Sequence, residues 1–269
     1  MKTITSRDNP AVKRLHGLAT SARDRRQHGQ TLLDGPHLVA AALDLGWPLR
    51  ELVVSDRGLA TIEIASLIER CAALPVTHLT GPLFAHVSPV DSPSGLLAVI
   101  DLPAPPAAQR FSESLLVLDG VQDAGNLGTI LRTAAAAGLG DVLLTAGCAQ
   151  AWSPRVLRAG MGGHFRLRIH EQVDVGRALR DYPHRILATG LGAGARELYD
   201  ADLCAPVAWL FGAEGRGVSP EAAALATGTI VIPMPGAVES LNVAAAAAVC
   251  LFEQLRQRRA AAKDVYRPR

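Results

Sequence analysis

The sequence has 269 residues with a formal net charge of +2, of which 49% are hydrophobic and 19% are charged, a composition typical of globular proteins with a sizeable core. No apolar run reaches the roughly 18 residues needed to cross a bilayer, and residues 1–10 lack the apolar core of a secretory signal, so we expect a cytoplasmic protein with no membrane partner. The four cysteines are dispersed, without a CxxC pair or a Cys/His pair at metal-ligand spacing, which argues against disulfides and a structural metal site.

Residues 1–101 are predicted to form a small α/β domain. Apolar periodicity predicts helices over Leu38–Leu45 and Thr61–Ala73. Strands are predicted at Leu49–Ser55 (LRELVVS) and Leu96–Asp101 (LLAVID), the second of which is apolar enough to be fully buried.

Charge is concentrated at the two ends of the chain. Residues 1–30 carry seven basic and two acidic side chains, and residues 253–269 carry six basic and two acidic ones. The residues between them, with 14 basic and 21 acidic side chains, have a net charge of −7. Basic flanks on an acidic middle favour a polyanion held by the flanks. For the carboxy-terminal stretch alone, a solubilising tail is an equally good interpretation.

A proline-rich segment separates the predicted domain at residues 1–101 from the rest of the chain. Residues 102–114 (LPAPPAAQRFSES) hold three prolines within four residues, which favours an extended connector over a helix or a central strand. We therefore predict a linker at residues 102–114, a second domain at residues 115–260 and a basic tail at residues 261–269.

The second domain alternates strands with helices. Apolar strands are predicted at Leu115–Leu118, Val142–Thr145, Arg185–Thr189, Val207–Phe211 and Thr229–Ile232, and a last helix from about Leu241 to Arg258, in which Cys250 is predicted to be a buried inert thiol. Such alternation implies a mainly parallel sheet covered on both faces. Ligands of these sheets collect at the carboxyl ends of the strands, where the polar residues described next are found.

The helix that follows the first of these strands has one polar side. Asn126 stands where the helix N-cap is expected. On a helical wheel, Leu127 and Ile130 belong to an apolar arc, whereas Asn126 and Arg132 share the opposite arc and project from the same side of the first two turns. Taken alone, this segment is explained more simply as a capping residue and a solvated arginine.

Two further segments carry polar residues at strand ends. Glycines 212, 215 and 217 surround Glu214 and would let the backbone approach a ligand closely. Glu214 is placed either to bind a polar ligand or to orient an arginine. After the last strand, Ser240 and Asn242 stand at the start of the final helix, which either of them could cap.

A glycine-rich stretch at residues 185–195 (RILATGLGAGA) imitates a dinucleotide-binding fingerprint, with Gly190, Gly192 and Ala195 after a strand and Glu214 about twenty residues further on. That fingerprint should open a helix. Residues 196–206 are short and polar with no apolar stripe, so we reject a nicotinamide-dependent oxidoreductase.

Together the three polar segments resemble the SpoU (TrmH) family of SPOUT-class methyltransferases. Asn126–Ala134 is similar to the family pattern N-x-G-x-x-x-R-T-A, and Phe211–Gly217 to F-G-x-E-G-x-G. The pattern I-P-M…S-L-N-V is found at Ile232–Met234 and Ser240–Val243. These segments stand in the family's order and spacing.

A further segment, Ser153–Phe165 (SPRVLRAGMGGHF), is similar to the family's P-K-x-x-R-A-S-x-G-x-x-F. Arg155 and Gly160 replace the usual lysine and serine, and Ala124 stands where the family often has proline. None of these three changes touches an expected catalytic position, although they are expected to affect loop shape. The resemblance covers about 145 residues.

This resemblance implies a knotted SPOUT-type parallel-sheet catalytic domain that binds S-adenosylmethionine and methylates a ribose 2′-hydroxyl of RNA, in a homodimer without a metal ion. It implies the catalytic residues Asn126, Arg132, Glu214, Ser240 and Asn242. It implies cofactor contacts at Thr189, Gly190, Gly212, Glu214, Gly217, Ile232, Met234, Ser240, Leu241 and Asn242.

The resemblance assigns activation of the 2′-hydroxyl to Arg132. A guanidinium group is a poor base at neutral pH. We therefore favour Arg132 as a group that stabilises the developing alkoxide and holds the neighbouring phosphate, with the role of base as the alternative.

Residues 1–101 look like the small RNA-binding domain of these enzymes, an α/β unit akin to certain ribosomal proteins. The likeness is carried by Ser6–Val12 (SRDNPAV), Leu32–Ala41 (LLDGPHLVAA) and the strand near Val53. We expect ribosomal RNA as the substrate and transfer RNA as the alternative. A non-catalytic RNA-binding member of the same fold is a further alternative, against which the intact set of five catalytic residues argues.

Overall fold

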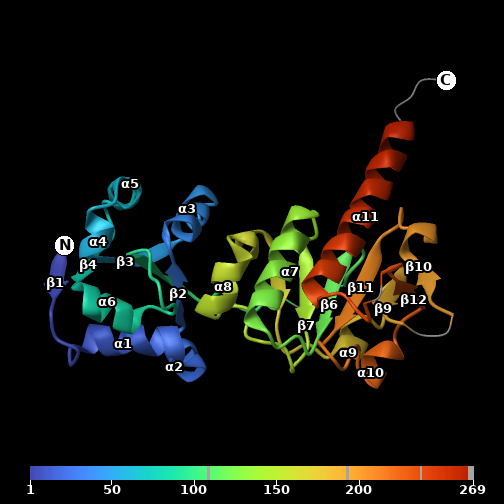
Figure 1. Cartoon of the computed structure of the whole chain (residues 1–269), viewed down its shortest axis with the longest axis horizontal. Coiled ribbons are helices and arrows are strands. Elements are labelled where there is room, and N and C mark those ends of the chain that lie inside the picture. Colours follow the sequence, from blue (N-terminus) through green and yellow to red (C-terminus); the bar gives the residue numbers. More distant parts are fainter. Residues whose placement is uncertain (108–109, 192–193, 237, 266–269) are drawn as a thin grey trace. The chain divides into compact units, whose positions relative to one another are not determined.

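The computed structural model describes residues 1–107, 110–191, 194–236 and 238–265 (Figure 1). The chain divides into two compact units. Unit 1 consists of Met1–Ala104 together with Gln150–Phe165, and unit 2 consists of Pro105–Ala149 and Arg166–Arg269.

Unit 1 is built on a mixed sheet with the strand order β1-β4-β3-β5-β2. Its strands are β1 (Lys2–Ile4), β2 (Gln30–Asp34), β3 (Leu49–Ser55), β4 (Val76–Leu79) and β5 (Leu96–Asp101). Its helices are α1 (Pro10–Thr20), α2 (Ala22–His28), α3 (Pro36–Asp44), α4 (Asp56–Leu59), α5 (Ile62–Arg70), α6 (Gly81–Val87) and α8 (Pro154–Gly160). Strand β4 is parallel to β1 and β3, whereas β5 is antiparallel to β2 and β3.

The helices of unit 1 cover both faces of this sheet. Helices α1, α2 and α6 lie on one face, and α3, α4 and α5 on the other (Figure 1). Val12, Leu15 and Leu18 of α1 and Phe84 of α6 are buried in one apolar cluster with residues of the sheet. This i, i+3, i+6 spacing on α1 is the apolar stripe that brings a surface helix onto a sheet. The predicted strands at β3 and β5 have the predicted bounds, and the predicted helices overlap α3 and α5.

The segment 150–165 follows β7 in the sequence but packs within unit 1. The hydroxyl of Thr31 on β2 donates a hydrogen bond to the carbonyl oxygen of Trp152 at 2.8 Å. Asp34, also on β2, forms an ion pair with Arg158 of α8, and burial raises the pKa of the Asp34 carboxyl. The predicted second domain, residues 115–260, includes this segment, whereas its contacts place it in unit 1.

Unit 2 is a parallel sheet with the strand order β10-β12-β9-β11-β6-β7-β8. Its strands are β6 (Leu115–Asp119), β7 (Asp141–Leu144), β8 (Arg168–His170), β9 (Arg185–Thr189), β10 (Arg196–Glu197), β11 (Val207–Gly212) and β12 (Gly228–Val231). Its helices are α7 (Ala124–Ala136), α9 (Val175–Ala178), α10 (Pro220–Ala223) and α11 (Val243–Val265), with a 3₁₀ turn at Leu198–Asp200. A further 3₁₀ turn, Gly163–Arg166, has its first three residues in unit 1. Every adjacent pair of these described strands is parallel, as predicted.

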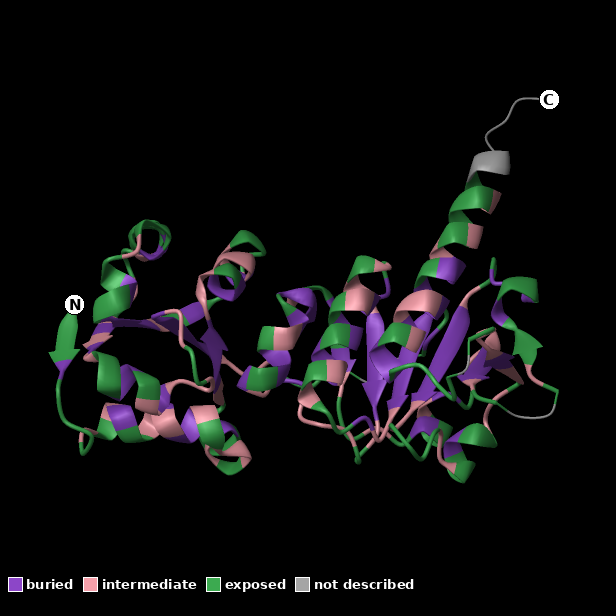
Figure 2. Cartoon of the chain, viewed as in Figure 1, coloured by how far each residue is buried: buried purple, intermediate pink, exposed green. Residues whose placement is uncertain are grey.

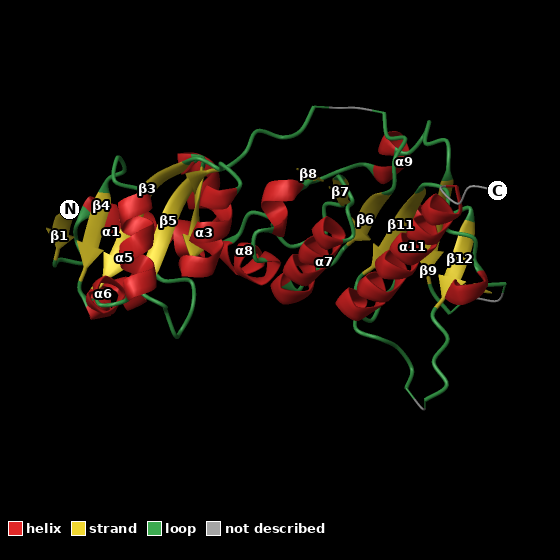
Figure 3. Ribbon diagram, turned by 90° about the horizontal axis from the view of Figure 1, so that it is seen from above, coloured by secondary structure: helices red, strands yellow, loops and turns green. Residues whose placement is uncertain are grey.

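Helices cover both faces of the unit 2 sheet. Helices α7 and α11 lie on one face, as Figure 3 shows. On the other face, Val175 of α9 and Ala222 of α10 are buried in one cluster with Val117 and Leu210 of the central strands. These strands are buried along most of their length (Figure 2), which explains why they are continuous apolar runs in the sequence.

The five predicted strands of this sheet are all present, as β6, β7, β9, β11 and β12. The short strands β8 and β10 were not predicted, because two or three residues give no readable periodicity. The knot that the resemblance implies stays a prediction.

The described residues contain no helix that is long and apolar enough to cross a membrane. The same residues hold no group of three or more histidine, cysteine, aspartate or glutamate side chains placed to bind a metal ion. All four cysteines are free thiols. Cys250 is buried as predicted, and burial raises the pKa of its thiol to about 12.

Candidate active site

The glycine-rich loop after β11 closes on itself. The backbone N–H of Ala213 donates to the carbonyl oxygen of Gly217 at 3.1 Å, and the N–H of Gly217 donates to the carbonyl oxygen of Ala213 at 2.9 Å. Gly215 and Gly217 have φ angles of +80° and +68°, in the left-handed region that favours glycine. Glu214 therefore stands on a tight loop at the carboxyl end of a central strand.

Helix α7 begins earlier than predicted. Its N-cap is Asp123, whose Oδ1 accepts a hydrogen bond from the N–H of Asn126 at 2.7 Å. The prediction that Asn126 caps this helix is therefore wrong, because the aspartate three residues earlier supplies the capping oxygen. As a consequence, the Asn126 side chain is not used for capping.

Helix α11 begins at Val243, directly after Asn242. The Oδ1 atom of Asn242 accepts hydrogen bonds from the N–H groups of Ala244 at 2.9 Å and Ala245 at 3.4 Å. Of the two predicted candidates, Asn242 is thus the residue that caps the helix.

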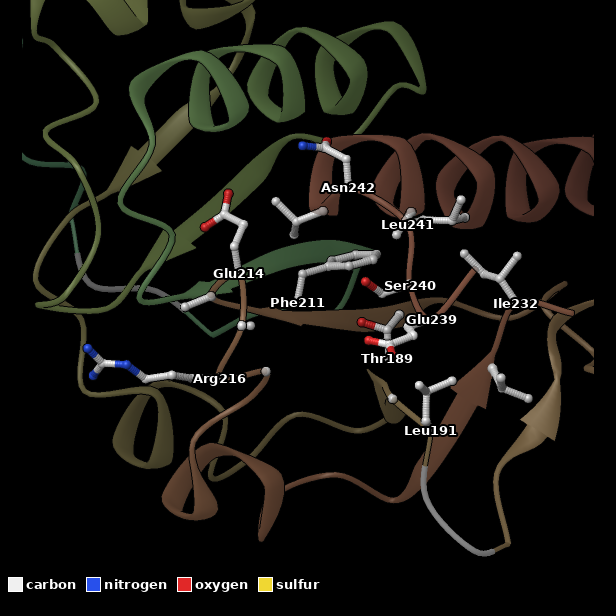
Figure 4. A pocket seen from close by; sticks show the side chains of 18 of the residues that line it. Thr189, Leu191, Phe211, Glu214, Arg216, Ile232, Glu239, Ser240, Leu241 and Asn242 are labelled. Carbon is white, nitrogen blue, oxygen red and sulfur yellow. The ribbon is translucent and has the colours of Figure 1, made fainter. Parts of the chain in front are cut away.

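A chain of side-chain hydrogen bonds connects the three predicted segments. Asn242 donates through Nδ2 to Oδ1 of Asn126 at 3.0 Å, and Asn126 donates through Nδ2 to Oε1 of Glu214. In Figure 4 the Glu214 carboxylate points towards Asn242. We call this chain of Asn242, Asn126 and Glu214 the amide relay. It holds the Glu214 carboxylate against the starts of two helices.

A cavity of about 680 Å³ opens beside the amide relay, a volume within the usual range for small-molecule sites. All ten predicted cofactor-binding residues line it: Thr189, Gly190, Gly212, Glu214, Gly217, Ile232, Met234, Ser240, Leu241 and Asn242 (Figure 4). Ala213, Gly215 and Arg216 of the predicted glycine-rich loop also line it. Sequence reasoning missed Leu191, Phe211, Ile230, Val231, Glu239, Val243 and Ala246, which line it as well. Most of the missed residues are immediate chain neighbours of the predicted ones.

The cavity lining fits the S-adenosylmethionine that the resemblance implies. Phe211, Ile232 and Leu241 supply apolar wall for a flat ring system, while the carboxylates of Glu214 and Glu239 are of the sign that attracts a sulfonium or ammonium group. Where glycines line the cavity, the backbone itself is exposed to a ligand.

Arg132 lies on α7, is exposed, and is not among the residues that line the cavity. No side-chain partner of Arg132 is present within the described part of the chain, and the same holds for Arg216 on the glycine loop. Arg216 extends away from Glu214 in Figure 4. Both cationic side chains are thus available to a polyanion, Arg216 at the cavity and Arg132 on the exposed side of α7.

Comparisons with known proteins identify relatives among RNA methyltransferases. The model of the SpoU rRNA Methylase family matches residues 113–252, and that of an MRM3-like substrate binding domain matches residues 9–98. An uncharacterized tRNA/rRNA methyltransferase of Synechocystis is 34% identical, covering 96% of this chain and 95% of that protein. The 23S rRNA (guanosine(2553)-2′-O)-methyltransferase RlmP of Bacillus subtilis is 32% identical, covering 94% of this chain and 98% of that protein. A crystal structure of an AdoMet-bound rRNA methyltransferase from Sinorhizobium meliloti superposes with a TM-score of 0.78 at 30% identity, covering 95% and 97% of the two chains.

Proposed function

Since the chain belongs to the SpoU rRNA methylase family, we propose that it transfers the methyl group of S-adenosylmethionine to a ribose 2′-hydroxyl of ribosomal RNA. The observation that carries this proposal is the cavity whose lining includes all ten predicted cofactor residues, next to the amide relay. S-adenosylmethionine supplies an electrophilic methyl group on a positively charged sulfur.

An in-line methyl transfer depends on positioning and charge stabilisation, and the side chains of the candidate site have separate roles in it. The negative charges of Glu214 and Glu239 favour binding of the cationic cofactor in the cavity. The amide relay keeps Glu214 in one orientation. Arg132 holds the RNA phosphate and stabilises the alkoxide that develops as the 2′-hydroxyl loses its proton to solvent water. When held by the residues that line the cavity, S-adenosylmethionine would give its methyl group to the ribose oxygen and would leave as the uncharged thioether.

Mapping of 2′-O-methyl sites by primer extension, in cells with and without the gene, tests the function. We expect one stop to disappear from 23S rRNA in the cells that lack the gene, since the relative from Bacillus subtilis is named for that RNA. A site lost from transfer RNA instead would favour the alternative substrate. Cofactor binding without methyl transfer to any RNA would contradict the proposal and favour a non-catalytic member. The cytoplasm is the proposed location of the reaction.

We propose that α2 of unit 1 contributes to RNA binding. Arg23 and Arg26 are exposed, and within the described residues neither has an acidic partner. The third arginine, Arg25, is buried and donates to two neutral acceptors, the carbonyl oxygen of Leu18 at 3.0 Å and Oε1 of Gln150 at 2.8 Å. The helix itself carries three arginines and one acid, Asp24, and so has a net positive charge.

The double substitution Arg23→Ala and Arg26→Ala is expected to weaken RNA binding about tenfold at low salt. Because each phosphate contact releases condensed counterions, the slope of log Kd against log salt should fall by about 1.5 for two lost contacts. Filter binding from 50 to 300 mM salt would measure both effects. Arg70→Ala is the matched control, since Arg70 is already paired with Asp44 at 2.6 Å. An unchanged slope in the double variant would exclude α2 from the RNA contact.

We also propose a homodimer, in which α11 contacts the partner. Phe252 on this helix is 47% exposed, and it lines a hollow together with Leu255, Ala260 and the two arginines Arg256 and Arg259. Phe252→Glu is expected to convert the dimer to a monomer in light scattering, because it places a charge in an apolar contact. Arg177→Glu, which changes an exposed residue of α9 away from this hollow, controls for charge alone. A dimeric Phe252→Glu variant would contradict this interface.

A further inference from the structure

Asp119 ends strand β6 at the carboxyl edge of the unit 2 sheet, and its carboxylate connects three backbone segments. Its Oδ2 accepts a hydrogen bond from the N–H of Ser219 at 2.8 Å. Its Oδ1 accepts one from the hydroxyl of Thr145 at 3.1 Å, and the Thr145 oxygen accepts one from the N–H of Gly120 at 3.0 Å. In each of these three hydrogen bonds an N–H or O–H group donates and an oxygen atom accepts. We call the group of Asp119, Thr145 and Ser219 the Asp119 clasp.

Asp119 lies beside both ends of the glycine loop that carries Glu214, and its side chain binds the exit. At the entry to the loop, Gly212 is the register partner of Asp119 in the β6–β11 ladder. At the exit, Ser219 donates its backbone N–H to the Asp119 side chain. The five residues between Gly212 and Val218 include two glycines with positive φ. A loop of this composition has many conformations open to it unless its ends are fixed.

We propose that Asp119 is a positioning residue for methyl transfer. The carboxylate fixes the exit of the glycine loop, so that the loop lines the cofactor cavity in one conformation and presents Glu214 to Asn126. A hydrogen bond from a backbone N–H to a carboxylate is stronger than one to a neutral acceptor. Because the loop is held before the cofactor arrives, binding does not have to order it. This inference rests on the proposed function.

Asp119→Ala removes both arms of the clasp and is expected to raise the Kd for S-adenosylmethionine at least tenfold, measured by calorimetry in the absence of RNA. Asp119→Asn serves as the conservative rescue. Its amide oxygen can accept from Ser219 while its nitrogen donates to the Thr145 oxygen, so its Kd should return to within about threefold of the wild type. Thr145→Val, which removes one arm only, should give an intermediate Kd and provides the measurement if Asp119→Ala does not fold.

A second readout follows the loop itself. Trypsin cleaves after Arg216, an exposed residue between the two ends of the loop. Asp119→Ala should accelerate cleavage at this bond several-fold, because release of Ser219 frees the loop, whereas Asp119→Asn should be cleaved as slowly as the wild type. Loss of general stability would not produce this difference at one bond.

The matched control is Asp174→Ala. Asp174 caps α9 by accepting from the N–H of Arg177 at 3.0 Å, so the variant loses a comparable hydrogen bond away from the loop. We expect its cofactor Kd and its cleavage after Arg216 to equal those of the wild type. The inference fails if Asp119→Ala binds the cofactor within twofold of the wild type, or if Asp174→Ala weakens binding equally. Both readouts are obtained without RNA, so a wild-type protein that methylates no RNA would overturn the proposed function and leave this test decisive.

Discussion

Arg132→Ala is expected to abolish methyl transfer while the Kd for S-adenosylmethionine stays within a few-fold of the wild-type value. The separation follows from position: Arg132 is exposed on α7 and is not part of the cavity lining. Loss of one group that stabilises a developing oxyanion costs about 10²- to 10³-fold in rate, and loss of a phosphate contact adds to it. Single-turnover rates at saturating RNA and cofactor, together with calorimetry, would measure the two quantities separately.

Arg132→Lys distinguishes anion stabilisation from binding by charge alone. Lysine keeps the positive charge but loses the planar fork that binds phosphate and alkoxide oxygens in a bidentate manner. RNA affinity should therefore recover more than the rate does. Arg177→Ala, which removes an exposed arginine on α9 at the other face of the sheet, should change neither quantity. A large loss of cofactor binding in Arg132→Ala would contradict the proposed role.

The parallel sheet of unit 2 could be predicted from the sequence because its central strands are buried on both faces. Such strands are continuous apolar runs, as at β9, where the predicted and observed bounds are both Arg185–Thr189. The edge strand β10, with only Arg196 and Glu197, is exposed and offers no such signal. The strands of this sheet could thus be predicted because they are buried, and not because of the backbone preferences of their residues.

The candidate site could be predicted as a set of residues but not as a set of contacts. The pattern at residues 126–134 identified Asn126, but single residues cannot reveal which of two nearby polar side chains caps a helix. Asp123 takes that role, which leaves the Asn126 amide to join Glu214 and Asn242. Asp119 offered no sequence signal beyond a polar residue at a strand end, because its partners lie far away in the chain at Thr145 and Ser219.

Sequence reasoning also could not assign the segment 150–165 to unit 1. Its pattern matches the methyltransferase part of the chain, and the contacts that hold it, such as Thr31 with Trp152, join residues that are distant in sequence. Long-range hydrogen bonds of this kind produce no periodic pattern of apolar residues in the sequence from which they could be predicted.

Gly212→Ala is expected to raise the Kd for S-adenosylmethionine about 100-fold and to abolish methyl transfer. A Cβ atom at position 212 would lie 2.0 Å from the carbonyl carbon of Gly217 and 2.1 Å from both the Gly217 oxygen and the nitrogen of Val218. All three are backbone atoms of the closed glycine loop. They can move away only if the pairing of Ala213 with Gly217 opens, which carries Glu214 out of the amide relay. Forced overpacking costs about 1–3 kcal/mol, and each 1.4 kcal/mol is tenfold in affinity.

The requirement for glycine at position 212 is one of space and not of backbone conformation, and two control variants separate these causes. At Gly236 a Cβ atom would meet no atom within 4 Å, so Gly236→Ala should bind the cofactor like the wild type. At Gly215 the space is also open but φ is +80°, so Gly215→Ala should weaken binding only through the strain of a left-handed alanine, about tenfold. Calorimetry would rank the Kd values of the three variants for the cofactor, and thermal unfolding would check that each variant is folded. If Gly212→Ala bound as tightly as Gly236→Ala, the closed loop could not be the conformation that binds the cofactor.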